Sequence, residues 1–272
     1  MKKKTKETQV FTHEHYKYLK KIRIGTFFVH LSRILLLVLL LGMWELATSV
    51  GWLDPFIASS PSRIVKTFIN LLTEADLLYH TWITLYETML AFLISTALGL
   101  IIAIILYNIP PIKRVLEPYL VVLNSLPKIA LGPLIIVWMG TGEKTIIAMG
   151  VLICIVITTI SMLNGFCQVE NDKIMLMRTM GANKAQIFTR LVFPYNIPNL
   201  ISNLKINIGM AWVGVIMGEY LTSRAGLGYL IVYGGQIFKL DLVMTSIVVL
   251  CVLAGAMYGI IALIENYVNK KH

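Results

Sequence analysis

The stretch "TIIAMGVLICIVITTISMLNGF", Thr145–Phe166, contains 22 residues and no charged side chain. A helix needs about 20 mostly apolar residues to cross the hydrocarbon core of a bilayer, so this stretch is long enough to span a membrane. Five further stretches are similarly apolar: Ile34–Trp52, Trp82–Tyr107, Tyr119–Met139, Leu200–Met217 and Leu242–Ile264. The sequence therefore predicts an all-α integral membrane protein with six transmembrane helices.

The composition agrees with this class. Hydrophobic residues make up 57% of the chain and charged residues only 14%, whereas a soluble domain has about 25% charged residues. The three cysteines, Cys154, Cys167 and Cys251, lie in or beside apolar stretches without CxxC or Cys/His spacing. We therefore expect neither a disulfide framework nor a metal site.

The basic residues predict the orientation of the chain. With a cytoplasmic N-terminus, 18 of the 24 Lys and Arg residues fall in cytoplasmic segments and 5 in outer loops, while Lys128 lies within a span. Cytoplasmic loops of membrane proteins carry such an excess of Lys and Arg. We therefore predict a multi-pass protein of the cytoplasmic membrane with both termini in the cytoplasm. The net charge of +10 then requires no nucleic-acid partner.

The chain divides into three predicted regions. Residues 1–33 form a basic cytoplasmic tail that is too long for the n-region of a cleaved signal peptide and has no A-x-A site after it, so a retained anchor is expected. Residues 34–268 form the membrane domain, with a cytoplasmic loop at about 167–199, and residues 269–272 form a second cytoplasmic tail.

The cytoplasmic loop contains "RTMGANKAQIFTRLVFPYNIP", Arg178–Pro198. Its apolar residues recur at three- and four-residue spacing, which is typical of an amphipathic helix. Gly181 permits a close backbone approach or a break between two short helices. Pro194 and Pro198 are expected to end this helix and begin the next element. Two interpretations follow, a helix on the lipid surface or a docking helix for a soluble partner.

The spacing after Gly181 resembles a loop found in the membrane subunits of ATP-binding-cassette (ABC) importers. That loop has the form E-A-A, three residues, glycine, nine residues and I-x-L-P. Here nine residues separate Gly181 from "LVFP", Leu191–Pro194, but Met175, Leu176 and Met177 occupy the E-A-A positions. The acidic residue of the pattern is therefore absent.

Longer segments extend the resemblance over most of residues 53–268. "LEPYLVVLNSLPKIALGPLIIVWMGTGE", Leu116–Glu143, and "LKINIGMAWVGVIMGEYLTSRAGLGYLI", Leu204–Ile231, are similar to segments of the nitrate, sulfonate and taurine permease group. "FIASSPSRIV", after the first span, also resembles that group. The segments occur in the same order as in the group.

The resemblance implies a type I ABC importer permease, a transport subunit that is not an enzyme. Two such chains, expected to form a homodimer, would bind two ATPase subunits and receive substrate from an extracytoplasmic binding protein. The loop would then be the coupling helix, which contacts the ATPase through Gly181, its neighbours and an apolar face around Phe188. The residues implied in this contact are Arg178, Gly181, Ala182, Lys184, Phe188 and Pro194.

The same resemblance favours a small anionic substrate such as an aliphatic sulfonate, taurine or nitrate. A neutral or cationic metabolite, such as a thiamine pyrimidine precursor, and a stand-alone secondary transporter are the alternatives. No cofactor is expected, because "GTGEKT", Gly140–Thr145, lacks the spacing of a phosphate-binding loop.

A charge at membrane depth indicates a functional residue, and Lys128 follows Pro127 inside the third predicted span. Pro127 and Pro133 predict an interrupted helix that lines a cavity or is covered by protein. Lys128 would attract an anion there; alternatively, it extends toward the cytoplasm or pairs with Glu219 or Glu87.

Glu219, near the end of the fifth span, is predicted to be a gate or a subunit contact, or else a water-exposed carboxylate. The complete predicted set for the path or gate is Asn124, Pro127, Lys128, Trp212 and Glu219.

Overall fold

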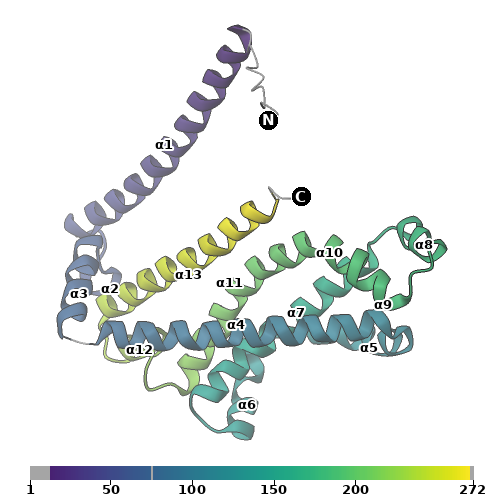
Figure 1. Ribbon diagram of the computed structural model, residues 1–272. Coiled ribbons are helices and arrows are strands. Elements are labelled where there is room, and N and C mark those ends of the chain that lie inside the picture. Colours follow the sequence, from purple (N-terminus) through teal and green to yellow (C-terminus); the bar gives the residue numbers. More distant parts are fainter. Residues whose placement is uncertain (1–12, 75, 270–272) are drawn as a thin grey trace, which may run out of the picture. The chain divides into compact units, whose positions relative to one another are not determined.

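The structure, a computed structural model, describes residues 13–74 and 76–269, and the described part is helical throughout (Figure 1). The helices are α1 (His13–Ser49), α2 (Pro55–Ala58), α3 (Pro61–Glu74), α4 (Leu77–Asn108), α5 (Pro110–Ser125), the 3₁₀ helix η1 (Lys128–Leu131), α6 (Gly132–Met139), α7 (Glu143–Cys167), α8 (Asn171–Thr179), α9 (Lys184–Ile187), the π-helix η2 (Phe188–Val192), α10 (Phe193–Tyr195), α11 (Ile197–Thr222), α12 (Leu227–Gln236) and α13 (Leu240–Asn269). The chain forms two compact units, residues 1–63 and 64–272.

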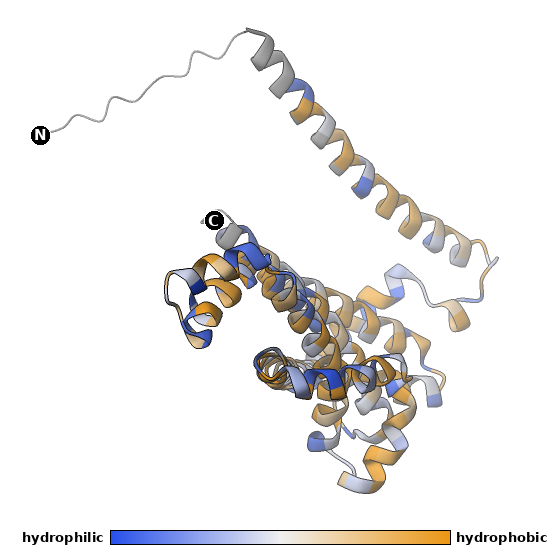
Figure 2. Cartoon of the chain, turned by 90° about the vertical axis from the view of Figure 1, so that its right-hand side faces the viewer, coloured by the Kyte–Doolittle hydropathy of each residue, from blue (hydrophilic) through white to orange (hydrophobic). Residues whose placement is uncertain are grey.

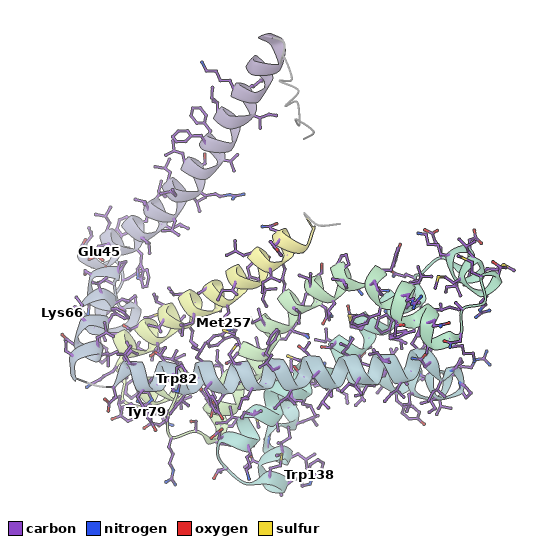
Figure 3. All side chains as sticks on the ribbon, in the orientation of Figure 1. Glu45, Lys66, Tyr79, Trp82, Trp138 and Met257 are labelled. Carbon is purple, nitrogen blue, oxygen red and sulfur yellow. The ribbon has the colours of Figure 1, made fainter. Side chains whose placement is uncertain are left out.

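The first unit consists of α1, α2 and the first residues of α3. α1 begins well before the predicted span and includes part of the predicted basic tail. The Glu45 carboxylate accepts hydrogen bonds from the backbone N–H of Ser62 at 3.0 Å and from its hydroxyl at 2.8 Å. Figure 3 labels Glu45 near the end of α1. These bonds join the end of α1 to the start of α3.

Five helices in the described part are long and apolar enough to cross a membrane: α1 from Lys20 onward, α4, α7, α11 and α13. They correspond to five of the six predicted spans. The predicted span over Tyr119–Met139 is interrupted, as Pro127 and Pro133 indicated: α5 ends at Ser125 and the chain bends by 90° before η1 and α6. The bent pair gives a sixth span if it is counted as one.

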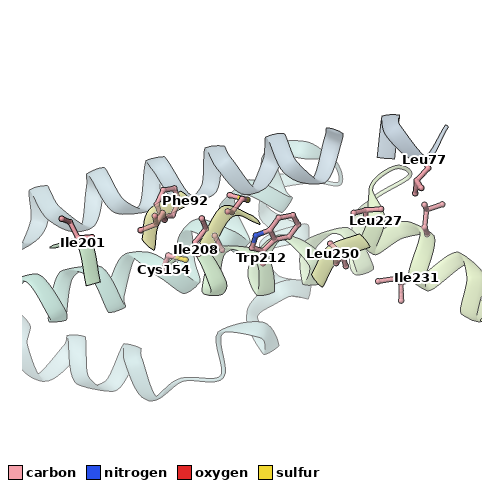
Figure 4. Packing of buried hydrophobic residues seen from close by; sticks show 13 residues of the cluster. Leu77, Phe92, Cys154, Ile201, Ile208, Trp212, Leu227, Ile231 and Leu250 are labelled. Atoms are coloured by element: carbon pink, nitrogen blue, oxygen red, sulfur yellow. The ribbon is translucent and has the colours of Figure 1, made fainter. Parts of the chain in front are cut away.

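The second unit is built around α7, which packs against α4 on one side and α11 on another. α12 and α13 pack on α11 and complete the largest apolar cluster, in which Phe92, Cys154, Trp212 and Leu250 are buried (Figure 4). The outward faces remain apolar: Leu98, for example, is 42% exposed. Figure 2 shows apolar residues along most of the helix surfaces, as expected of helices that contact lipid.

Tryptophan and tyrosine occur near the ends of several of these helices. Trp82 lies in the second turn of α4 and is 65% exposed, while Trp138 lies at the end of α6 and is 73% exposed (Figure 3). Aromatic residues in such positions are typical of the membrane–water interface.

α7 and α11 approach each other closely at two glycines. A Cβ atom added to Gly214 would lie 2.6 Å from the Cα of Gly150, and one added to Gly218 would lie 2.9 Å from the Cα of Ile146. Small residues permit such contacts between membrane helices. The Gly255 and Gly259 pair of α13 differs, because an added Cβ would meet no described atom within 4 Å.

We predict that Gly214→Ala destabilises the chain by about 1–3 kcal/mol, because the added methyl group meets backbone that cannot move without separating the helices. Thermal unfolding of the purified chain in detergent measures the change. Gly209→Ala is the matched control, since Gly209 lies in the same helix with open space around it. Equal unfolding temperatures for the two variants would contradict the proposed close contact.

Candidate functional site

The predicted cytoplasmic loop folds as two short helices with a break at Gly181, as expected. Gly181 has φ +82°, a conformation that glycine adopts without strain. α9 then begins with a capping box: the Asn183 side chain accepts from the Gln186 N–H at 2.8 Å, and the Gln186 side chain accepts from the Asn183 N–H at 2.9 Å. Pro194 lies near the end of a helical run that continues from α9 through η2 to Tyr195, and Pro198 lies in the first turn of α11, where proline is tolerated.

Phe188 is half-buried in an aromatic cluster. Its ring centroid is 5.7 Å from that of Tyr107, 5.3 Å from that of Phe166 and 6.1 Å from that of Phe193. Its ring therefore packs the loop against the ends of α4 and α7. Phe188 also lines an open pocket with Arg178 and Lys184, so an apolar contact face around it stays a prediction.

The exposed apolar residues of the loop lie around α8. Met175, Leu176 and Met180 are 67%, 62% and 77% exposed, and Gly181 follows them directly. We call these four residues the α8 apolar tip. Met175 and Leu176 occupy two of the E-A-A positions, where the pattern has an acidic residue first. Neither was therefore predicted to be a contact residue. The available signal was three large apolar side chains beside a turn, in a loop predicted to be cytoplasmic.

The other predicted coupling residues surround this tip. Arg178 and Lys184 are exposed and line an open pocket of about 460 Å³ between α8, α9 and the end of α4. Ala182 is half-buried, and its N–H donates to the Met177 carbonyl at 3.0 Å. Pro194 is half-buried in α10. The loop thus presents basic side chains next to an apolar projection.

Three of the predicted path residues lie together at the break in the third span. Asn124 is in the last turn of α5, Pro127 precedes η1, and Lys128 begins η1 and is half-buried. Lys128 takes part in none of the ion pairs found among the described residues, so pairing with Glu219 or Glu87 is not observed. The side chain lies near Cys154 of α7.

Trp212 is separate from these residues. It is 4% exposed and packs in the main apolar cluster with Phe92, Cys154 and Leu250 (Figure 4). Its indole N–H has no hydrogen-bond partner among the described residues. Trp212 was predicted to line the path, but the structure places it in the core.

Glu219 is 1% exposed, which excludes the alternative that its carboxylate is exposed to water. Its Oε1 accepts from the Thr84 hydroxyl at 2.6 Å and its Oε2 accepts from the Gly228 N–H at 2.5 Å. Thr84 Oγ1 in turn accepts from the Leu227 N–H at 2.7 Å. The Gly226 N–H donates to His80 Nδ1 at 3.0 Å. These bonds join the turn between α11 and α12 to α4.

Glycine is required at this turn. A Cβ atom added to Gly228 would lie 2.7 Å from Glu219 Oε2, and Gly226 has φ +107°. Glu219 lies on the α11 turn next to Gly218, which contacts Ile146, whereas Lys128 lies near Cys154. Ile146 and Cys154 are about 12 Å apart along α7 at a rise of about 1.5 Å per residue. No hydrogen bond or ion pair among the described residues joins Lys128 to Glu219, so a shared site for the predicted path residues stays a prediction.

Thr84→Val should destabilise the chain by about 1–3 kcal/mol, because it removes the hydroxyl between Glu219 and the Leu227 N–H and leaves both buried groups without that partner. Thermal unfolding in detergent measures the effect. Thr222→Val is the control, because its hydroxyl donates only to Gly218 O in its own helix. An unchanged unfolding temperature for Thr84→Val would show that the hydroxyl does not join α4 to the turn.

Comparison with known proteins agrees with this architecture. Residues 95–270 match the family described as binding-protein-dependent transport system inner membrane component. A probable ABC transporter permease protein of Haemophilus influenzae is 29% identical, over 84% of this chain and 92% of its own. The putative aliphatic sulfonates transport permease protein SsuC of Bacillus subtilis is 27% identical, over 87% and 86%. The formylaminopyrimidine transport permease protein ThiX of Halalkalibacterium halodurans is 30% identical, over 72% and 77%.

Solved structures share the fold. A chain of the MetNI methionine ABC transporter in an inward-facing conformation superposes with a TM-score of 0.63 at 21% identity, over 71% of this chain and 95% of its own. A chain of a bacterial ABC transporter for the import of alginate gives 0.66 at 12% identity, over 94% and 99%. This chain therefore belongs to the binding-protein-dependent transport system inner membrane component family, and it is a multi-pass membrane permease subunit of the ABC importer type.

Proposed function

We propose that two copies of this chain form the membrane path of an importer for a small anionic solute, driven by two ATPase subunits and supplied by an extracytoplasmic binding protein. The α8 apolar tip is the observation that supports this proposal most directly. It lies in the loop where charge distribution predicts the cytoplasm, and it exposes Met175, Leu176 and Met180 to solvent. A soluble partner with an apolar groove would remove this surface from water.

The attachment of the loop supports a coupling function. Phe188 packs against Tyr107 of α4 and Phe166 of α7, so a displacement of the loop would also move two membrane helices. ATP-driven closure of the partner subunits would then be transmitted as a rigid-body movement of helices. A stand-alone secondary transporter would not need a projecting apolar tip of this kind.

The anionic substrate is supported by Lys128 and by the names of some relatives. Lys128 lies half-buried at a 90° break in the third span. A cation at membrane depth is costly to insert, so its presence there indicates a function. Among the relatives are permeases named for aliphatic sulfonates and for taurine, but others are named for formylaminopyrimidine and riboflavin. A neutral or cationic metabolite is therefore the second candidate substrate class.

Met180→Glu should abolish co-purification of the ATPase that accompanies the wild-type chain, because a carboxylate would be placed in an apolar contact. Met180 is 77% exposed, so the chain itself should unfold at an unchanged temperature. Met180→Leu keeps the apolar contact and should retain the ATPase. Retention of the ATPase by Met180→Glu would rule out the α8 apolar tip as the docking surface.

Lys128→Gln should raise the concentration of sulfonate or nitrate needed for half-maximal uptake by about tenfold, since a charge interaction of about 1.4 kcal/mol is a factor of ten. Uptake into proteoliposomes that contain the chain, its ATPase and its binding protein measures this. Lys128→Arg should preserve the affinity, and Lys239→Gln controls for the loss of an exposed charge. The same affinity for Lys128→Gln and wild type would exclude Lys128 from anion selection.

A further inference from the structure

A second buried carboxyl group lies beside Glu219. Glu87, on α4 one turn beyond Thr84, is 2% exposed, and its carboxyl group lies next to that of Glu219, which the Thr84 hydroxyl contacts. Glu219 already accepts from the Thr84 hydroxyl and the Gly228 N–H. The second oxygen of Glu87, Oε2, has no hydrogen-bond partner among the described residues.

No described cation neutralises this pair through an ion pair. Arg224 is exposed and lines a pocket of about 300 Å³ with Glu87, at the end of the helices where the outer loops are predicted. His80 Nδ1 accepts from the Gly226 N–H, so that nitrogen carries no proton. The titratable or charged groups around the pair are His80 and Tyr86 of α4, Glu143 of α7, Tyr220 of α11, Arg224 of the following turn and Tyr229 of α12.

The chemistry of two adjacent carboxyl groups restricts their protonation. Ionised carboxylates only accept hydrogen bonds, so the adjacent carboxyl groups of Glu87 and Glu219 can bond to each other only when one of them carries a proton. Glu219 uses both oxygens as acceptors toward Thr84 and Gly228, which suits the ionised form. Glu87 then carries the proton and donates it to Glu219. Two ionised carboxylates would instead repel each other in an apolar environment.

We propose that Glu87 and Glu219 form a proton-binding site that fastens the α11–α12 turn to α4. One proton from solution forms the O–H bond on Glu87 and returns to solution when the site is deprotonated. In the unfolded chain both carboxyls are ionised at neutral pH. The folded chain therefore binds one more proton, so its stability is greatest at acidic and neutral pH and falls as pH rises through the titration of the site.

Infrared spectroscopy and thermal unfolding of the purified chain in detergent test this site without any partner protein. The wild-type chain should show the carbonyl stretch of a protonated, buried carboxyl at neutral pH, and this band should disappear at alkaline pH together with a fall in the unfolding temperature. Glu87→Gln keeps the shape of the side chain and its ability to donate. It should lack the band, and its unfolding temperature should fall less at alkaline pH.

Glu143→Gln is the matched control, because Glu143 lines the same pocket and is exposed. This variant should keep both the band and the pH dependence of the wild type. The proposal is overturned if wild type and Glu87→Gln give the same spectra at neutral pH, or lose stability equally at alkaline pH. Neither result depends on the ATPase, so failure here leaves the proposed transport function unaffected.

Discussion

The contact between α7 and α11 is the constraint on which the other features of the second unit depend. Gly150 and Gly214 allow the two backbones to touch, and this contact determines where both ends of α11 lie. At one end, α11 leads back through α10 and η2 to the loop with the α8 apolar tip. At the other end, α11 carries Glu219 into the hydrogen bonds with α4 and α12. Both candidate sites are therefore extensions of one packed helix pair.

Much of the fold could be predicted from the sequence, because long apolar stretches and loop charges have few alternative explanations. The break at Gly181 and the start of α11 near Pro198 were also predictable, since glycine permits a positive φ and proline ends or begins helices locally. The bend before η1 was predicted only as an interruption. Its 90° angle depends on packing, which proline spacing alone does not determine.

The faces of the helices were the least predictable feature. In a membrane both the lipid-facing and the protein-facing sides of a helix are apolar, so hydropathy does not distinguish them. For this reason Trp212 was expected beside the path, although it packs inside the unit. The buried pair of Glu87 and Glu219 brings together residues far apart in sequence, and no local pattern indicates it.

The bent third span also has a thermodynamic consequence for assembly. The Val122 carbonyl of α5 accepts from the Leu126 N–H at 3.1 Å, but among the described residues no continuing helix donates to the α5 carbonyls after it, because the chain turns away after Ser125. In hydrocarbon each such group without a partner costs several kcal/mol, so this helix end must lie beside water or another protein surface. Association with a second membrane subunit would cover it. For this chain, assembly would then contribute to folding as well as to transport.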